Sequence, residues 1–261
     1  MHRRAPRVAE TDVMALEDFV RSPNQANDPR LYDLENEALD RDGRVLDAMR
    51  DVAPWRDRVL VDLGCGSGYW LPGYAQESAT VIGVEPDPNL LPLARARDPR
   101  VTVLHGSAEH IPLPDASVDV VHARFAYFFP PGCDAGLSEV MRVLRPGGSL
   151  VVVDNDRRHG QFADFLAASP WAAYQGSAEG TDTWWRDRGA QRREVMSDWR
   201  FDKRSDLEAV LGMEFPPEAT AAWLAEHLDA VSFGYGYVLF SVARSITSPL
   251  RRTGSFGTHG S

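Results

Sequence analysis

A short apolar segment that breaks at once into glycine constrains the fold of this 261-residue chain more than any other feature. Val59 to Leu63 has the composition of a buried strand, Gly64 to Gly68 forms a G-x-G-x-G loop, and a helical pattern starts at Tyr69. Glycine accepts positive φ, and its missing side chain lets ligand atoms approach the main chain. Peptide N–H groups at the start of the helix would face an anionic group. The pattern favours a ligand-binding strand–loop–helix unit over a tight turn that binds nothing.

A second strand places an acid beside this loop. Val81 to Glu85 ends in a carboxylate 21 residues beyond Gly64. A carboxylate at the tip of the neighbouring parallel strand accepts both hydroxyls of a ribose, as in nicotinamide-dependent enzymes. Their G-x-G-x-x-G pattern, however, requires glycine where this chain has Tyr69. A nicotinamide oxidoreductase is therefore the weaker interpretation.

The glycine loop, with Asp62 in front of it, resembles motif I of the class I S-adenosylmethionine-dependent methyltransferases, and residues 84–87 resemble their motif II. Residues 106–121 resemble the adenine-side loop and fourth strand of that family, with Ser107 where Asp or Asn is usual. The resemblance covers about residues 58–154. It implies S-adenosylmethionine as the cofactor, bound by Asp62, Gly64, Cys65, Gly66, Gly68, Glu85, Pro86, Ser107, Ala108, Glu109 and His122.

Strands alternate with helices along the chain, which predicts parallel βαβ units in a sheet covered on both faces. Strands expected at 194–201 and 235–242 bring the total to seven. The resemblance then implies an α/β, Rossmann-like fold with a mostly parallel seven-stranded sheet, strand order 3-2-1-4-5-7-6, the last strand being antiparallel. We expect an N-terminal helical cap at 1–57, the methyltransferase domain at 58–245 and a disordered tail at 246–261.

Helical spacing in the N-terminal segment predicts a short helix near 13–20 and a longer one that opens at Asp28 and bends at Gly43. In class I methyltransferases such helices cover the cofactor and part of the substrate cleft. The resemblance therefore makes Tyr32 and Asn36 candidates for lining that cleft, against a packing or surface role that the residues suit equally well.

Three residues near strand ends are candidates for catalysis. His122 follows the fourth strand at the carboxyl edge of the sheet, where it would either line the cofactor or act in proton transfer. Asp154 and His159 come just past the next strand, where an Asx turn and helix cap explain the same residues. The aromatic residues that follow His122 suit a core, or one or two rings facing the sulfonium; they are Phe125, Tyr127, Phe128 and Phe129.

Residues 170–189 form an insert beyond the familiar region, with Trp171, Tyr174, Trp184 and Trp185 among several glycines. That composition suits a lid over an apolar or aromatic substrate, or a small satellite core under a loop.

Composition excludes several classes of protein. A net charge of −10 and a pI near 5.2 argue against a nucleic-acid partner. The Asn/Asp-Pro-Pro-aromatic motif of amino-methylating nucleic-acid enzymes is also missing after the fourth strand. No apolar run is long enough to cross a membrane, and the N-terminus lacks an apolar signal segment. The two cysteines, Cys65 and Cys133, give neither a disulfide framework nor zinc spacing, so we expect a cytoplasmic protein without a metal.

Together these features predict methyl transfer from S-adenosylmethionine to a small-molecule acceptor. The alternative is an S-adenosylmethionine-binding protein or a non-methylating enzyme on the same fold, because this fold carries other functions.

Overall fold

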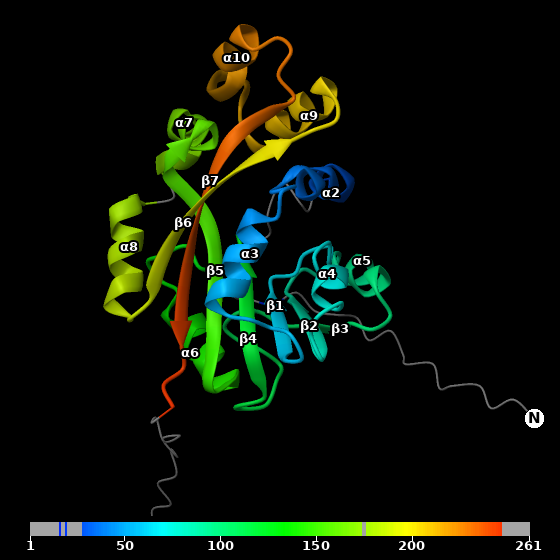
Figure 1. The fold of residues 1–261 in the computed structure, drawn as a ribbon, viewed down its shortest axis with the longest axis vertical. Helices are drawn as coiled ribbons and strands as arrows, with labels where there is room; N and C mark the ends of the chain where they lie inside the picture. The colour runs from blue at the N-terminus through cyan, green and yellow to red at the C-terminus, as the bar shows by residue number, and fades with distance from the viewer. Residues whose placement is uncertain (1–15, 17–18, 20–27, 174–175, 247–261) are drawn as a thin grey trace, which may run out of the picture.

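A computed structural model describes residues 16, 19, 28–173 and 176–246. Its centre is a seven-stranded sheet with the order β3-β2-β1-β4-β5-β7-β6, as predicted (Figure 1). The strands are β1 (Val59–Leu63), β2 (Thr80–Glu85), β3 (Thr102–His105), β4 (Val118–Arg124), β5 (Leu144–Gly160), β6 (Gln191–Arg200) and β7 (Ser232–Ala243). Most of the expected helix near 13–20 and nearly all of the expected C-terminal tail lie outside the described residues.

The strands β1 to β5 are parallel, and β7 is the antiparallel strand. It pairs antiparallel with both β5 and β6, so β6 again runs in the direction of the first five strands. Parallel strands need crossover connections. Helices provide them between β1 and β2, β2 and β3, and β4 and β5, and a loop provides the one between β3 and β4. The carboxyl ends of β1, β2 and β4 consequently meet at one edge of the sheet.

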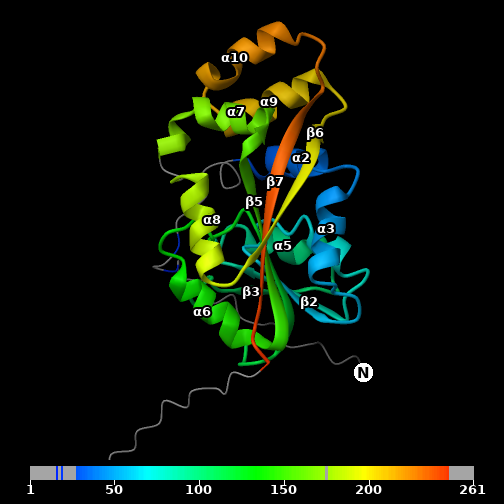
Figure 2. The same cartoon turned by 60° about the vertical axis from the view of Figure 1, so that its left-hand side comes forward.

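Helices cover both faces of the sheet, and strand alternation divides the core accordingly (Figure 2). One face carries Leu60, Val120 and Val151 beneath the N-terminal helices, and the other carries Val61, Val121 and Val152 beneath helices later in the chain. The first face is covered by α3 (Arg44–Val52), α4 (Leu71–Tyr74) and α5 (Leu91–Arg97), and the second by α6 (Asp134–Val143) and α8 (Ala178–Asp187).

The fifth strand is longer than the sequence indicates. We expected it to end at Asp154, but β5 continues to Gly160 because β7 pairs with it beyond that point, with Asn155 opposite Tyr237 and Gly160 opposite Tyr235. A bulge between Asn155 and Gly160 admits the polar residues without breaking the strand. Asp154 and His159 therefore lie within a strand instead of past its end.

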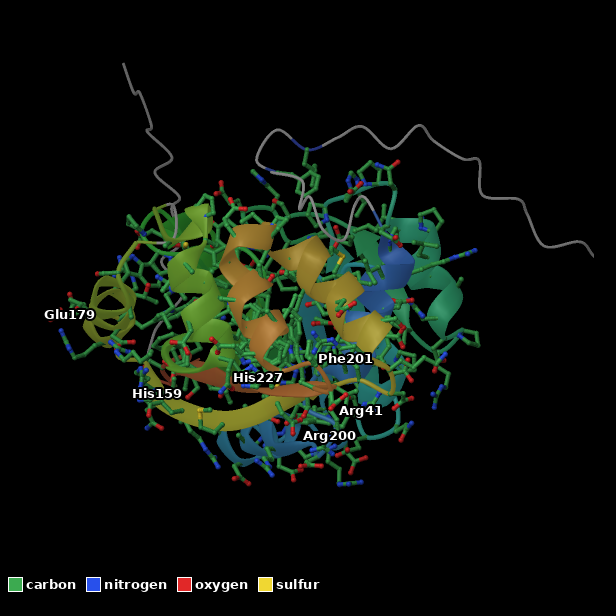
Figure 3. The ribbon with its side chains drawn as sticks, turned by 90° about the horizontal axis from the view of Figure 1, so that it is seen from above. Arg41, His159, Glu179, Arg200, Phe201 and His227 are labelled. Carbon is green, nitrogen blue, oxygen red and sulfur yellow. The ribbon has the colours of Figure 1, made fainter. Side chains whose placement is uncertain are left out.

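The long ends of β5, β6 and β7 carry a second group of helices (Figure 1; seen from above in Figure 3). These are α7 (Gln161–Ala168), α9 (Arg204–Glu214) and α10 (Pro217–Glu226), and α2 (Pro29–Ala38) packs against α9. The N-terminal helix begins at Asp28 as predicted, but it is two separate helices, α2 and α3, and not one helix bent at Gly43. Asp28 caps α2 by accepting hydrogen bonds from two backbone N–H groups, and Gly43, at φ 73°, precedes α3. Within the described residues, no helix combines the length and apolarity needed to cross a bilayer.

Candidate active site

The glycine loop follows β1 directly, and its three glycines all have positive φ. Gly64 has φ 73°, and a Cβ built there would lie 2.6 Å from the Cβ of Ala126. A Cβ on Gly68 would lie 2.8 Å from the Cα of Ala94. At these two positions glycine therefore has two roles: it allows the left-handed backbone conformation, and its lack of a side chain leaves room for the neighbouring residue.

Glu85 lies at the end of β2 with its carboxyl group turned toward this loop. One oxygen accepts a hydrogen bond from the Gly66 N–H at 2.7 Å, and the other accepts one from the Asp87 N–H at 2.8 Å. Burial raises the pKa of Glu85 to about 7, while these two backbone hydrogen bonds oppose the rise. Each oxygen keeps a lone pair for a further donor, which is what the two hydroxyls of a ribose require.

A cleft of about 370 Å³, including its opening to solvent, lies between the glycine loop, α2 and the end of β4. It brings together three predicted cofactor residues, Asp62, Gly64 and Cys65, and both predicted helix residues, Tyr32 and Asn36. The rest of its lining is Ser67, Tyr69, Trp70, Arg124 and Phe125.

Asn36 and Trp70 are fixed to each other at the rim of the cleft. Asn36 donates to the Tyr32 carbonyl at 2.8 Å and accepts from the Trp70 indole N–H at 2.7 Å. Arg124 lies with its guanidinium carbon 3.9 Å from the centre of the Trp70 ring, which is a cation–π contact. The N-terminal helix is thus held against the glycine loop by directed contacts.

Asp62 and Arg124 place opposite charges in the same cleft. Asp62 is 3% exposed, and burial raises its pKa to about 7 although the charge of Arg124 opposes that rise. An ammonium group and a carboxylate group on one ligand, such as those of an amino acid, match this pair of charges.

Of the four aromatic residues that follow His122, Phe125 lines the cleft. Its φ is 50°, a conformation that is unfavourable for a bulky side chain. A backbone hydrogen bond of 2.9 Å from its N–H to Val153 holds it there, and its ring stacks on Tyr235 with 6.5 Å between centroids. By contrast Phe128, 1% exposed, packs in the core against Trp185. The aromatic segment therefore contributes to both the core and the cleft.

Gly66, Gly68 and Glu85 are next to the cleft but are not part of its lining. Four further predicted cofactor residues lie around the ends of β2 and β3, also outside the lining. Ser107 and Ala108 are buried, and Ser107 accepts a hydrogen bond from the His110 N–H at 3.1 Å. Glu109 accepts one from the Tyr127 hydroxyl at 2.9 Å. The Pro86 carbonyl lies 3.1 Å from a ring nitrogen of His105.

His122 does not face the cleft, and this corrects our expectation. It is fully buried between Trp55 and Tyr74, with ring centroids 5.0 and 5.1 Å away, and neither ring nitrogen has a hydrogen-bond partner among the described residues. Burial, with the neighbouring Arg124 charge, lowers its pKa to about 3. In this structure the imidazole is neutral and packs in the core between aromatic rings, away from the cleft.

Asp154 and His159 are also away from the cleft. Strand alternation turns Asp154 to the opposite face of the sheet, where it lines a separate hollow of about 210 Å³ with Thr181 and Phe240. Burial raises its pKa to about 6. The side chain of His159 is 53% exposed and lies 2.6 Å from Asp156 at the surface (Figure 3). None of the three catalytic candidates lines the cleft.

The side chains that sequence reasoning missed are Ser67, Tyr69, Trp70 and Arg124. Arg124 could have been predicted from the sequence. It is two residues after His122, so its side chain points to the same face of β4, but it lies at the end of the strand. The structure also describes the second half of the aromatic insert. There Trp185, 1% exposed, stacks on Phe240 with 5.3 Å between centroids, which favours the satellite-core alternative for α8 over a lid.

Comparison with known proteins agrees with this geometry. Residues 61–152 match the model of a methyltransferase domain. An uncharacterised methyltransferase of Mycobacterium bovis is 40% identical over 106 residues, which is 41% of this chain and 43% of that protein. The chain thus matches less than half of the length of this relative.

Two solved structures share the fold at low identity. An S-adenosylmethionine-dependent methyltransferase from Aquifex aeolicus superposes with a TM-score of 0.52 at 17% identity, covering 80% of this chain and 97% of that one. The [4+2]-cyclase SpnF superposes with a TM-score of 0.52 at 19% identity, covering 86% and 97%. The sheet order, the glycine loop with its strand-end acid and the match agree with one another: residues 61–152 are similar to a methyltransferase domain, and the chain has the fold of an S-adenosylmethionine-dependent methyltransferase.

Proposed function

We propose that this protein transfers a methyl group from S-adenosylmethionine to a small-molecule acceptor. The observation that supports the proposal is the placement of Glu85, which is hydrogen-bonded to the glycine loop that lines the cleft and retains one lone pair on each oxygen. In this proposal Glu85 holds the ribose, Asp62 and Arg124 hold the two charged groups of the methionine portion, and residues 107–109 border the adenine.

When bound, S-adenosylmethionine supplies a methyl group already activated on a sulfonium. The protein then has to orient the acceptor and exclude water, an effect that reaches about 7–11 kcal/mol for well-aligned reactants. The residues of the cleft are suited to both roles, because the pair formed by Asn36 and Trp70 closes α2 against the loop and Phe125 provides an aromatic wall. The predicted helical cap at 1–57 contributes to this closure through α2.

The acceptor proposed is small because the cleft is narrow and the chain is acidic. A net charge of −10 opposes binding of a polyphosphate, and among the described residues the cleft has one arginine, which is assigned above to the cofactor. The cysteines, Cys65 and Cys133, are free and buried, which agrees with the reducing cytoplasm in which we propose that the protein acts.

Calorimetric titration of the full chain with S-adenosylhomocysteine tests the cofactor site. We expect saturable binding that Glu85→Ala weakens and that Glu218→Ala, an exposed acid on α10, leaves unchanged. Binding that is equal in both variants would contradict the site.

A second candidate is a non-methylating enzyme on the same fold. SpnF, which shares the fold, is described as a [4+2]-cyclase, and none of the three residues predicted to act as catalysts reaches the cleft. Incubation with S-adenosylmethionine and an acceptor separates the two functions, because methyl transfer forms S-adenosylhomocysteine in step with methylated product, and a non-methylating reaction forms neither.

A further inference from the structure

Three side chains that can bind a metal lie together on the outer strands of the sheet, on the face opposite the cleft. They are Asp156 and His159 of β5 and Glu194 of β6, and their candidate ligand atoms all lie within 4.8 Å of one another. The Nδ1 atom of His159 lies 2.6 Å from the Oδ2 atom of Asp156. The expectation of a protein without a metal rested on the two cysteines, and this donor set contains neither of them.

A glycine on β7 allows side chains from the two flanking strands to meet. β7 lies between β5 and β6, and its residue Gly236 pairs with Met196 of β6. The bulge in β5 places residues 156–159 opposite Gly236. A Cβ on Gly236 would lie 2.6 Å from the carbonyl oxygen of His159 and 3.1 Å from the Cβ of Asp156, and it would also lie 3.2 Å from the Met196 Sδ. The space over Gly236 is therefore the place where β5 and β6 bring their side chains together.

Asp156 is the buried member of the donor set, and it connects the set with the hollow beside it. Its side chain is 1% exposed, and its Oδ1 atom accepts a hydrogen bond of 3.0 Å from the Arg158 N–H. Asp156 also lines the hollow of about 210 Å³, together with Thr181. Thr181 is 5% exposed, and its hydroxyl has no hydrogen-bond partner among the described residues. A buried hydroxyl of this kind needs a bound polar group, and water coordinated to a metal ion at Asp156 would supply one.

The charges around the donor set leave it able to bind a cation. The three arginines that line the hollow are already paired with carboxylates: Arg157 with Asp154, Arg158 with Asp182, and Arg192 with Asp182 and Glu194. None of these arginines forms an ion pair with Asp156. Glu194 accepts from Arg192 through Oε1 at 2.7 Å, which leaves its Oε2 atom for another partner.

We propose that Asp156, His159 and Glu194 bind a divalent transition-metal ion, for which Zn²⁺ is the best match. Zinc is bound by imidazole nitrogen and carboxylate oxygen, and three protein ligands leave one position of a tetrahedral ion for water. An imidazole ligand favours such ions over Mg²⁺ and Ca²⁺, which take oxygen ligands. The ion takes the place of the proton between His159 and Asp156, and the imidazole then carries its proton on Nε2. Bound there, the ion connects β5 with β6 across β7 and holds the bulge in position.

Titration with ZnCl₂ alone tests the site, with the full chain first treated with a chelator and dialysed. We expect one ion to bind per chain with saturation in the micromolar range, and Mg²⁺ in large excess should not displace it. Because the bound ion stabilises only the folded state, zinc should also raise the melting temperature of the unmodified chain. Absence of saturable binding, or displacement of zinc by Mg²⁺, would overturn the proposal.

Variants locate the ion at these side chains. His159→Ala and Glu194→Gln should each weaken zinc binding at least about tenfold, and both positions are partly exposed, so we expect the fold to be retained. The matched controls are His227→Ala and Glu179→Gln, at exposed positions outside the donor set, and they should bind zinc like the unmodified chain (Figure 3). Zinc affinity that is unchanged in His159→Ala, or that falls equally in the controls, would refute the site. Affinity for S-adenosylhomocysteine should be the same in all of these variants, so the result is independent of the proposed function.

Discussion

Replacing Glu85 by alanine removes the carboxyl group that connects β2 with the glycine loop. Its two oxygens each accept one backbone N–H, from Gly66 and from Asp87, and each has a lone pair left for a ribose hydroxyl. The variant would lose the acceptor for the ligand and the fixed position of Gly66 together.

The size of the effect follows from the number of hydrogen bonds. A hydrogen bond to a charged group contributes about 1.5–3 kcal/mol, but here the pKa of the acceptor is already raised to about 7, so part of the population is neutral near that pH. We therefore expect a total loss of about 1.5–3 kcal/mol, which is about 10- to 150-fold in the dissociation constant of S-adenosylhomocysteine. Glu85→Gln should not rescue binding, because its NH₂ group must face one of the two backbone N–H donors.

Isothermal titration calorimetry at pH 8, where the carboxyl is mostly ionised, measures this loss, with Glu218→Ala as the matched control. Thermal unfolding shows whether each variant remains folded. If Glu85→Gln bound as tightly as the unmodified protein, the two backbone donors would not be fixing the carboxyl group, and the reasoning would be wrong.

Three further outcomes are expected. Binding of S-adenosylhomocysteine should weaken as the pH falls below 7, because the pKa values of Asp62 and Glu85 are both raised to about 7 and the ligand favours the ionised carboxylates. The affinity should fall by up to about tenfold per pH unit for each of the two groups. If neither group is in the site, calorimetry across this range would show an affinity that does not change with pH. Because the pKa of His122 is lowered to about 3 in the folded protein, the unfolded chain takes up this proton first as the pH falls. The free energy of unfolding should therefore decrease by about 1.4 kcal/mol per pH unit below about pH 6.5. In urea unfolding, His122→Phe should lack this part of the pH dependence, and its cofactor affinity should be unchanged. Trp185→Ala should lower the free energy of unfolding by about 3–5 kcal/mol without changing cofactor affinity, whereas lost affinity at unchanged stability would favour a lid.

The sheet could be predicted because its evidence is local. Each strand from β1 to β4 is a short apolar run next to a turn signal, and the glycine loop with Glu85 identifies which strands are neighbours. The end of β5 could not be predicted in this way, because Asp154 to Gly160 is polar and belongs to a strand only through its pairing with β7. In this pairing Asn155 is opposite Tyr237, about eighty residues further along the chain. Non-local pairing overrides local composition there.

The same distinction explains the errors at the site. The cofactor residues stand beside recognisable motifs, so their positions along the chain are sufficient to nominate them. His122 was chosen because it follows an apolar strand, but β4 continues to Arg124, and the residue at the true strand end is the one that reaches the cleft. Whether a side chain at a strand end is enclosed depends on what packs over it, here Trp55 and Tyr74 from segments on either side of the glycine loop.

Acceptor specificity in this protein should therefore reside outside the matched methyltransferase domain. The matched domain covers residues 61–152, and it contains Asp62, Glu85 and Arg124. Tyr32 and Asn36, which line the cleft, come from α2, and α2 lies before those limits. Relatives that share the matched domain need not share this helix or the side chains that it adds to the cleft. We therefore expect that exchanging α2 between such relatives changes the preferred acceptor more than it changes the affinity for S-adenosylhomocysteine.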